Sequence, residues 1–508
     1  MENKTYPPTH SDSPPTQVTQ IKSGLEIHQQ LDTHKLFCDC PSVLRNDEPE
    51  FEVCRKLHAV AGETGEIDVA VEYEVGKDKE FVYQGYDTTC LVELDEEPPH
   101  LINQEALEIG LHISMLLNCE IVPIAQIMRK TVIDGSNTGG FQRTVLIARN
   151  GYVETEKGRV GINCILLEED AARIIRKEGG EKIKEDDRKK INEEDGKKIF
   201  RLDRLGIPLV EIATEPDIKS AEQAKEVALH IGDILRSCKV RRGIGTIRQD
   251  VNISIPGHPR IEIKGFQDTK MMIKTVEEEV KRQEENLKLG DKEELKSEVR
   301  NALVDGKTEF LRPMPGASRM YPETDLPLLR ISREIINNAK ESLPKLRTEV
   351  RKELREKGLS EEQIQILLKT DKLEEFESLL KLINDSKFIF KVLIEIPKEV
   401  GKHESKSVSE IDEILTLDII ESIVDLVDKK KIGRDDIKNI MEEIVKGKSF
   451  DEAVKIEKVD LGEVENEVAE LIKKKPGLSV GGYMGLIMHK FKGKISGKEV
   501  NEILGKLL

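Results

Sequence analysis

A short segment near the start of the chain, Gly24-Leu25-Glu26-Ile27-His28, alternates apolar and polar side chains. A period of two is typical of a β-strand, and it places Glu26 and His28 together on one face of that strand. A carboxylate and an imidazole on a rigid strand can bind a metal ion or transfer a proton. The same pattern fits a half-exposed strand whose polar face meets only solvent, so its meaning depends on acids elsewhere in the chain.

Four later segments carry acidic residues beside or within apolar runs. Burying one acid among apolar residues is costly unless a partner compensates its charge. A shared Mg²⁺ would compensate several acids at once, because this ion prefers oxygen ligands. Separate ion pairs with Arg204, Arg248 or Lys264 are the alternative for each acid alone. The four segments are Leu167-Glu168-Glu169-Asp170, Leu209-Val210-Glu211-Ile212, Gln249-Asp250-Val251-Asn252 and Ile261-Glu262-Ile263-Lys264.

The length and composition indicate a soluble protein of several domains. A chain of 508 residues is too long for one ordinary core, and 35% of its residues are charged, with a net charge of -17. No apolar run approaches the length that spans a membrane. Residues 1–20 are polar and rich in Pro and Thr, which predicts a disordered lead-in and no signal peptide. We therefore expect a cytoplasmic protein without a membrane segment.

Residue patterning predicts an α+β fold in which a mixed-sheet domain precedes two helical ones. Short strands and a few helices are expected in 21–330, including helices after Asn103 and from about Ser220 to Ser237. The segment 177–198 is nearly all charge and Gly, as in a solvated insertion. From residue 331 the apolar spacing is helical throughout, and a Gly/Lys-rich break near Lys429 separates 331–428 from a smaller bundle in 429–508.

Two further groups of residues can be interpreted either as functional sites or as residues without a specific function. Cys38 and Cys40, followed by Cys54 and His58, could supply four zinc ligands, but their spacing is irregular and free thiols are the alternative. Seven scattered cysteines do not form a disulfide framework. The region after residue 472 holds eight lysines and two glutamates, which would suit contact with nucleic-acid phosphates.

Several longer segments resemble the GatB/GatE family, and specifically its archaeal GatE type. The resemblance runs from about Ser23 to the C-terminus, where VGGYMGLIMHKFKGKISGKEVNEIL is similar to the YqeY-like tail domain of that family. It implies a catalytic cradle domain over 21–330, a helical domain over 331–428 and a tRNA-binding tail over 429–508. The other segments are GLEIHQQLDTHKLFCDCP, YDTTCLVELDEEPPH, RKTVIDGSNTGGFQRT, LLEEDAAR, RLGIPLVEIATEPDI, RQDVNISI and RPMPGASRMYPETDLP.

The resemblance implies a carbon-nitrogen ligase reaction, the ATP-dependent amidation of glutamate charged on tRNA(Gln). ATP phosphorylates the glutamyl carboxylate with the help of Mg²⁺, and ammonia then attacks the acyl phosphate. The chain shows no credible amide-hydrolysing nucleophile. The resemblance therefore implies ammonia from a GatD-like, asparaginase-like partner, in a heterodimer or an α2β2 heterotetramer.

Matching the family motifs residue by residue assigns candidate roles. His28, Glu169 and Glu211 match one metal site, and Glu26, Asp250 and Glu262 match a second one near the nucleotide. Glu26, His28, Glu169 and Glu211 are thereby the candidate catalytic residues, and Asp250, Glu262 and Lys264 the cofactor-binding ones. Lys494 and Lys498 are candidate tRNA contacts, with solvated surface lysines as the alternative.

The chain departs from the GatE pattern in two places, which keeps other functions open. The usual insertion, similar to part of aspartyl-tRNA synthetase, is replaced by a short charged stretch at about 284–307. The zinc set also differs, because bacterial relatives follow C-x-C with a later C-x-x-C. A tRNA-binding scaffold without catalysis, and a GatB-like subunit working with an amidase, are the competing hypotheses.

Overall fold

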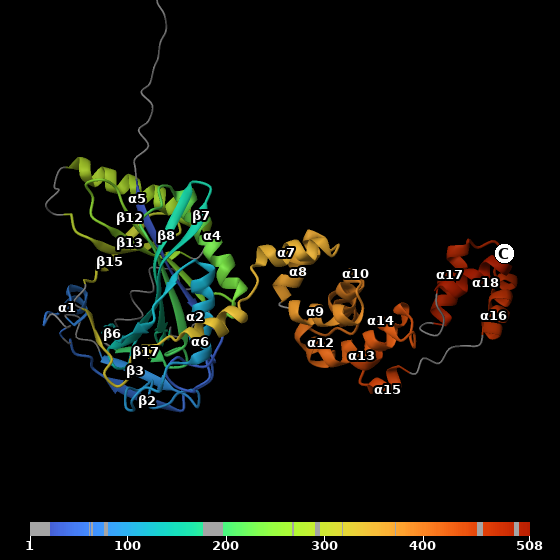
Figure 1. The fold of residues 1–508 in the computed structure, drawn as a ribbon. Helices are drawn as coiled ribbons and strands as arrows, with labels where there is room; N and C mark the ends of the chain where they lie inside the picture. The colour runs from blue at the N-terminus through green and yellow to red at the C-terminus, as the bar shows by residue number, and fades with distance from the viewer. Residues whose placement is uncertain are drawn as a thin grey trace, which may run out of the picture. The chain divides into compact units, whose positions relative to one another are not determined.

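The computed structural model describes residues 21–59, 61, 65–75, 80–175, 197–266, 269–289, 295–316, 319–370, 372–454, 461–491 and 497–507. These residues belong to two compact units, Met1–Arg347 and Thr348–Leu508 (Figure 1). The expected α+β architecture is confirmed, with mixed sheets in the first unit and helices alone in the second. The expected disordered lead-in at 1–20 and nearly all of the charged segment 177–198 lie outside the described residues.

A mixed sheet organises the first unit. Its described strands follow the order β15-β14-β13-β12-β1-β11-β8-β7-β6-β16, with β4 paired on β7, and all neighbours are antiparallel except β13 and β14. The strands are β1 (Lys22–Gln30), β4 (Glu120–Ile121), β6 (Ile127–Thr131), β7 (Phe141–Thr155), β8 (Gly158–Glu169), β11 (Pro208–Thr214), β12 (Ile247–Ser254), β13 (Ile261–Phe266), β14 (Glu298–Ala302), β15 (Thr308–Pro313) and β16 (Met320–Pro322).

Two smaller sheets accompany the large one in this unit. One has the order β2-β3-β10-β9, and the other pairs β5 with β17. The four-stranded sheet has its own apolar cluster, in which the rings of Tyr83 and Phe200 stack. Their strands are β2 (Phe51–Arg55), β3 (Glu80–Gly85), β9 (Arg173–Ile174) and β10 (Lys197–Arg201), and β5 (Ile124–Ala125) with β17 (Leu329–Arg330).

Helices bury the apolar face of the large sheet. The chain forms α2 (Gln104–Leu116) and α4 (Ala221–Ser237) where the sequence predicts helices, with the side chains of Asn103 and Ser220 accepting N-cap hydrogen bonds. Leu25 and Ile27 of β1 are fully buried in the core that these helices help to form. The opposite face of β1 carries Glu26 and His28. The unit's other described helices are α1 (Val69–Val75), α5 (Thr269–Leu289) and α6 (Arg333–Glu341).

The boundary between the units differs from the expected one at residue 330. The first unit continues to Arg347, because α6 packs on α2 and its Ala339 is buried in the main core. The charged stretch at 284–307 is also partly incorporated into the fold. It contributes the end of α5 and all of β14, where Val299 is completely buried in the large sheet. Charge content alone did not reveal this strand.

The second unit contains two separate apolar cores. One core, from Val350 to Ala453, includes apolar residues of 364–368, 379–383 and 419–427, within the region whose spacing predicts helices. The other, from Val464 to Leu504, joins the last three helices. A helix, α13, does end at Asp428 near the predicted break, and Lys430 has a φ of 56°. The first core nevertheless continues across this point through Ile432 and Ile440 to Ala453, so the break does not separate the two cores.

The described helices of the second unit are mostly short. None of the described helices in the protein combines the length and the apolar character needed to cross a membrane. The helices are α7 (Arg347–Glu356), α8 (Glu361–Thr370), α9 (Leu373–Leu382), α10 (Ser386–Phe390), η2 (Lys391–Glu395), α11 (Ile396–His403), α12 (Val408–Ile414), α13 (Leu417–Asp428), η3 (Arg434–Asp436), α14 (Ile437–Val445), α15 (Phe450–Ala453), α16 (Leu461–Lys474), α17 (Val480–Lys490) and α18 (Gly497–Leu507).

Candidate metal and nucleotide site

The polar face of β1 forms the centre of the candidate site. β1 lies between β11 and β12, and the register sets His28 directly opposite Glu211 and Glu26 directly opposite Asp250. Side chains directly opposite on neighbouring strands point to the same face of a sheet. Strand alternation and register therefore bring these four residues to one surface, as the sequence analysis anticipated for acids converging on His28.

Three of these side chains form a compact ligand group. Nε2 of His28 lies 3.2 Å from Oε2 of Glu211 and 3.6 Å from Oε1 of Glu26. Candidate ligand atoms of Glu26, His28 and Glu211 all lie within 4.8 Å of one another. One imidazole and two carboxylates match the donor set of a divalent cation such as Mg²⁺, which keeps several waters when it binds to protein.

Glu168, and not the neighbouring Glu169, lies beside this group. Oε2 of Glu168 is 3.9 Å from Nε2 of His28. Glu169 accepts hydrogen bonds from the backbone N–H of Arg143 at 3.1 Å and from its guanidinium at 3.4 Å. Adjacent strand residues point to opposite faces, so Glu168 and Glu169 cannot share one site. The structure therefore places Glu168, and not Glu169, on the surface that carries His28, while the compact ligand group contains neither of them.

The second predicted ligand set is divided in the structure. Glu26 belongs to the His28 group, whereas Asp250 and Glu262 lie on either side of Lys264. The Lys264 ammonium is 2.6 Å from Asp250 and 2.5 Å from Glu262. This arrangement corresponds to the ion-pair alternative for these two acids. The geometry thus supports one metal-ligand group and a neighbouring cation held by two carboxylates.

Lys130 is a site residue that the sequence analysis did not identify. It lies on β6, and its ammonium donates a hydrogen bond to Glu168 at 2.5 Å and is 3.7 Å from Glu211. A buried lysine of this kind balances part of the negative charge around His28. Lys130 directly follows Arg129, so apolar and polar side chains do not alternate at this point of the strand. The sequence pattern therefore does not single out Lys130.

Burial and mutual repulsion perturb the protonation of the group. Burial, with the nearby Glu211 charge, raises the pKa of Glu26 to about 7. Burial and Glu211 also raise the pKa of Glu168. Burial opposes the charged forms of His28 and Glu211, yet the hydrogen bond with Glu211 helps to raise the pKa of His28. The Lys130 charge, followed by the hydrogen bond with His28, lowers the pKa of Glu211. Carboxylates held close together in this way would be stabilised by a bound cation.

A cavity of about 400 Å³ extends beside this polar surface. Lys264 lines it together with Arg312 and Arg319, and the other charged residues of its wall are Asp68, Glu74, Asp134 and Lys198. Guanidinium and ammonium groups are the protein donors that suit phosphate oxygens. The cavity is therefore a candidate place for the phosphates of a nucleotide, next to the group that would hold the metal.

The cysteines form a different cluster from the expected one. Cys38 and Cys40 lie with Cys90 and Glu93, and one ligand atom of each is within 4.8 Å of the others. Cys54 lies exposed on β2 and His58 is exposed beyond it. In the sequence, the spacing Cys90-x-x-Glu93 could have indicated that these two residues belong to one cluster.

The Glu93 carboxylate contacts several donors in this cluster. Its carboxylate is 2.9 Å from the ammonium of Lys35, and it accepts a hydrogen bond from the Cys38 thiol at 2.9 Å. The backbone N–H of Cys90 donates a further hydrogen bond at 2.8 Å. Because Lys35 is completely buried, it neutralises Glu93 from within the protein. These contacts fix the Glu93 carboxylate next to three thiols that lie close enough together to be metal ligands.

The candidate tRNA contacts fall at the edge of what the structure describes. Lys494 lies outside the described residues. Lys498 lies in α18, and only its backbone is described. Ser479, which stands in a nucleophile-elbow-like G-x-S-x-G sequence, caps α17 by accepting a hydrogen bond from Gly482. It therefore serves as a helix cap in a helical tail.

Comparison with known proteins identifies relatives over almost the whole chain. Residues 21–337 match the model for the GatB/GatE catalytic domain. The chain is 35% identical to the glutamyl-tRNA(Gln) amidotransferase E subunit of Methanocaldococcus jannaschii, over 96% of this chain and 98% of the relative. It is 32% identical to proteins of the same name from Pyrobaculum arsenaticum and Methanosarcina acetivorans, again over 96% of this chain and over 98% and 97% of the relatives.

These relatives contain internal residues that have no counterpart here. The three alignments extend over 640, 629 and 637 positions, more than the 508 residues of this chain, while covering nearly all of each relative. This difference supports the expectation that an insertion usual in such proteins is absent from the chain.

Proposed function

The chain belongs to the GatB/GatE family, and on this premise we propose that it is the subunit of a Glu-tRNA(Gln) amidotransferase that activates and amidates the glutamyl group. The observation that carries the proposal is the group of Glu26, His28 and Glu211 on the central strand, beside a cavity lined by cationic side chains. A metal-ligand group next to phosphate-binding donors is what phosphoryl transfer to a carboxylate requires.

The proposed reaction has two steps. The glutamyl γ-carboxylate attacks the γ-phosphorus of ATP, which forms an acyl phosphate and releases ADP. Ammonia then attacks the acyl carbon, inorganic phosphate leaves, and the nitrogen loses its extra proton to give the amide. The first step is needed because a free carboxylate has no adequate leaving group. Mg²⁺, when bound, neutralises charge on the phosphates and the carboxylate and aligns them.

The residues of this chain would have different roles in the reaction, according to their positions. Glu26, His28 and Glu211 would hold the metal, and Glu168 would balance Lys130 at the edge of that group. Lys264, held between Asp250 and Glu262, would present its ammonium to the nucleotide phosphates.

The ammonia would come from a partner with asparaginase-like chemistry of the GatD type. This part of the proposal rests on the family and on the absence of a credible amide-hydrolysing nucleophile in the sequence. A tRNA-binding role for the C-terminal part of the chain, including Lys494 and Lys498, is proposed on the lysine excess of that region. Zinc is not part of this proposal, although Cys38, Cys40, Cys90 and Glu93 lie close enough together to be ligands.

The test is formation of Gln-tRNA from Glu-tRNA(Gln) by the purified full-length chain with ATP, Mg²⁺ and ammonium chloride. Product that requires ATP and Mg²⁺ is expected, and His28→Ala should abolish it while leaving the affinity for tRNA nearly unchanged. An unaltered rate in the His28→Ala variant would refute the assigned site. Binding of tRNA without any product would instead favour the scaffold hypothesis.

A further inference from the structure

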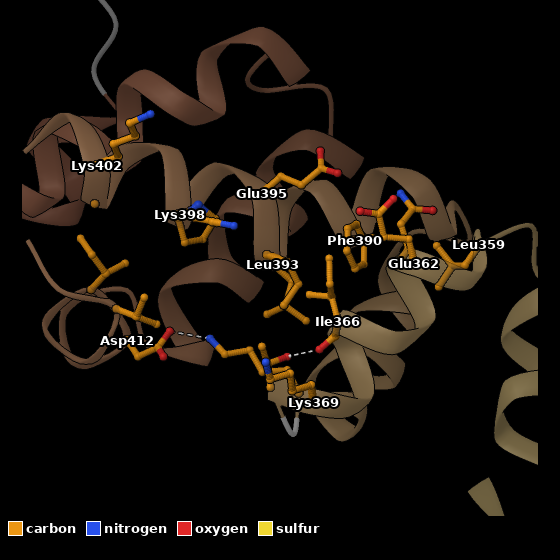
Figure 2. A pocket seen from close by; sticks show the side chains of 18 of the residues that line it. Leu359, Glu362, Ile366, Lys369, Phe390, Leu393, Glu395, Lys398, Lys402 and Asp412 are labelled. Carbon is orange, nitrogen blue, oxygen red and sulfur yellow. Dashed lines mark hydrogen bonds and ion pairs between the residues drawn. The ribbon is translucent and has the colours of Figure 1, made fainter. Parts of the chain in front are cut away.

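A groove of about 1460 Å³ crosses the first core of the second unit, away from any residue assigned above. It lies between α8, the π-helical segment η2 with α11, and the start of α12 (Figure 2). Single-turn π-helical segments interrupt α-helices frequently at functional positions. The position of η2 in the wall of this groove is a first indication that the surface has a binding role.

The floor of the groove is apolar. Phe390 and Leu393 are buried in the core, and their side chains meet the groove between α8 and α11 (Figure 2). Ile366 and Ile394 are half-buried along it, and Val408 at the start of α12 is 70% exposed. The half-buried Ile366 and Ile394 and the exposed Val408 are thus the apolar side chains that another apolar surface could cover.

The edges of the groove carry more lysines than acids. Lys369, Lys398 and Lys402 line it, and no ion pair involving them occurs among the described residues. Lys387 and Lys406 add further positive charge, whereas Lys372 is paired with Asp412 at 2.5 Å. Glu362 and Glu395 are the other acids at its edges. A local excess of unpaired lysines is notable in a chain whose net charge is -17.

The size of the groove limits the class of occupant. Sites for small molecules usually measure about 300–1,000 Å³, so this groove is larger than a metabolite needs. An RNA phosphate backbone would pair with the lysines but would gain nothing from an aliphatic floor. An amphipathic helix matches both features, because its apolar stripe covers the floor and its flanking carboxylates meet the lysines.

We propose that this groove binds an acidic amphipathic helix of a partner protein. Apolar residues of that helix at i, i+3 or i+4, and i+7 lie on Ile366, Ile394 and Val408. Its glutamates or aspartates lie against Lys369, Lys398 and Lys402. Burial of the apolar stripe supplies most of the affinity, and the lysines select an acidic sequence and set its position in the groove.

The probe for this proposal is a synthetic, fluorescein-labelled helix of about 18 residues, or about 27 Å. It carries leucines at heptad a and d positions, glutamates beside them and alanines elsewhere. Its anisotropy is measured with the full-length chain. Saturable binding is expected, and the double variant Lys398→Glu/Lys402→Glu should weaken it about tenfold or more. Val408→Asp, at an exposed first helical position where an acid is tolerated, should weaken it as well.

The control is the double variant Lys352→Glu/Lys431→Glu, which reverses two exposed lysines of the same unit outside the groove. It should bind the probe as the unmodified chain does, and thermal unfolding should show that all variants remain folded. Equal binding of a probe with serine in place of leucine would overturn the proposal, because charge alone would then explain it. So would the absence of saturable binding, or a groove variant that weakens only the binding of tRNA.

Discussion

Nε2 of His28 lies 3.2 Å from Oε2 of Glu211, and the two residues stand directly opposite each other on β1 and β11. The contact is a consequence of strand register, since a slip of one residue would turn His28 toward the helices. Both strands lie in the middle of the large sheet and are held on each side by other strands. The ligand group is therefore built on a rigid element, which favours precise placement of a metal.

The two adjacent glutamates of β8 are expected to behave differently when replaced by glutamine. Glu168→Gln should reduce Mg²⁺-dependent Gln-tRNA formation by about 10- to 100-fold, because Glu168 lies beside His28 and Lys130. Glu169→Gln should chiefly lower the free energy of unfolding, by about 2 kcal/mol, because it removes the charge that faces Arg143. Activity assays and urea unfolding measure the two effects. The reverse pattern would place Glu169 in the metal site.

Binding of Mg²⁺ is expected to strengthen as the pH rises through neutrality. The pKa of Glu26 is raised to about 7, so a proton competes with the metal below that pH. Calorimetry should show an affinity about tenfold higher at about pH 8 than at about pH 6. In Glu26→Gln this dependence should be clearly smaller. An equal pH dependence in the variant would show that another group accounts for it.

The same shift predicts a stability effect without metal. The folded-state pKa of Glu26 lies above its ordinary value of 4.5, so the folded state retains the proton that the unfolded state has lost. Between these two pH values, the contribution of Glu26 to stability is therefore lost as pH rises. In EDTA, the wild type should lose stability relative to Glu26→Gln across this window. A difference between the two proteins that stays constant would contradict this sign.

Lys264 provides a separate test of the nucleotide cavity. Lys264→Met keeps most of the side-chain volume and removes the ammonium held between Asp250 and Glu262. The KM for ATP should rise by about tenfold or more, since a charge-assisted contact to phosphate is lost. The KM for Glu-tRNA(Gln) should change little. A rise confined to the tRNA would mean that Lys264 faces the tRNA and not the nucleotide.

Removal of the last three helices tests the proposed tRNA-binding tail. Deletion of 455–508 removes a part with its own apolar core, so the preceding core should remain folded. The affinity for tRNA should fall, and the slope of log affinity against log salt should become shallower, because fewer phosphates are neutralised. Filter binding over a range of salt concentrations measures both quantities. Unchanged affinity and slope would remove this part from the binding surface.

Local patterning was sufficient for much of the fold and for part of the site. The alternation around Glu26 and His28 predicted β1 and its polar face, and the capping residues Asn103 and Ser220 predicted the starts of α2 and α4. Glu211 was identified because a single acid stands within an apolar strand. Such features depend only on residues that are close together in the sequence, so they can be predicted without the structure.

Features that depend on register or on distant partners could not be predicted in this way. Choosing between Glu168 and Glu169 requires the pairing of β8 with β11, which no local pattern determines. Cys90 joins Cys38 only because the fold brings together segments about fifty residues apart. Strand β14 was missed because its charged residues resemble the helix before it.

The measurement that tests the account most directly is ATP hydrolysis by the purified chain with Mg²⁺, with and without Glu-tRNA(Gln), for the wild type and for Glu211→Gln. We expect the charged tRNA to stimulate hydrolysis by the wild type. Stimulation should be lost in the variant, because its neutral amide no longer presents a carboxylate to the metal. Equal stimulation of both proteins would contradict the assignment of phosphoryl transfer to the group of Glu26, His28 and Glu211.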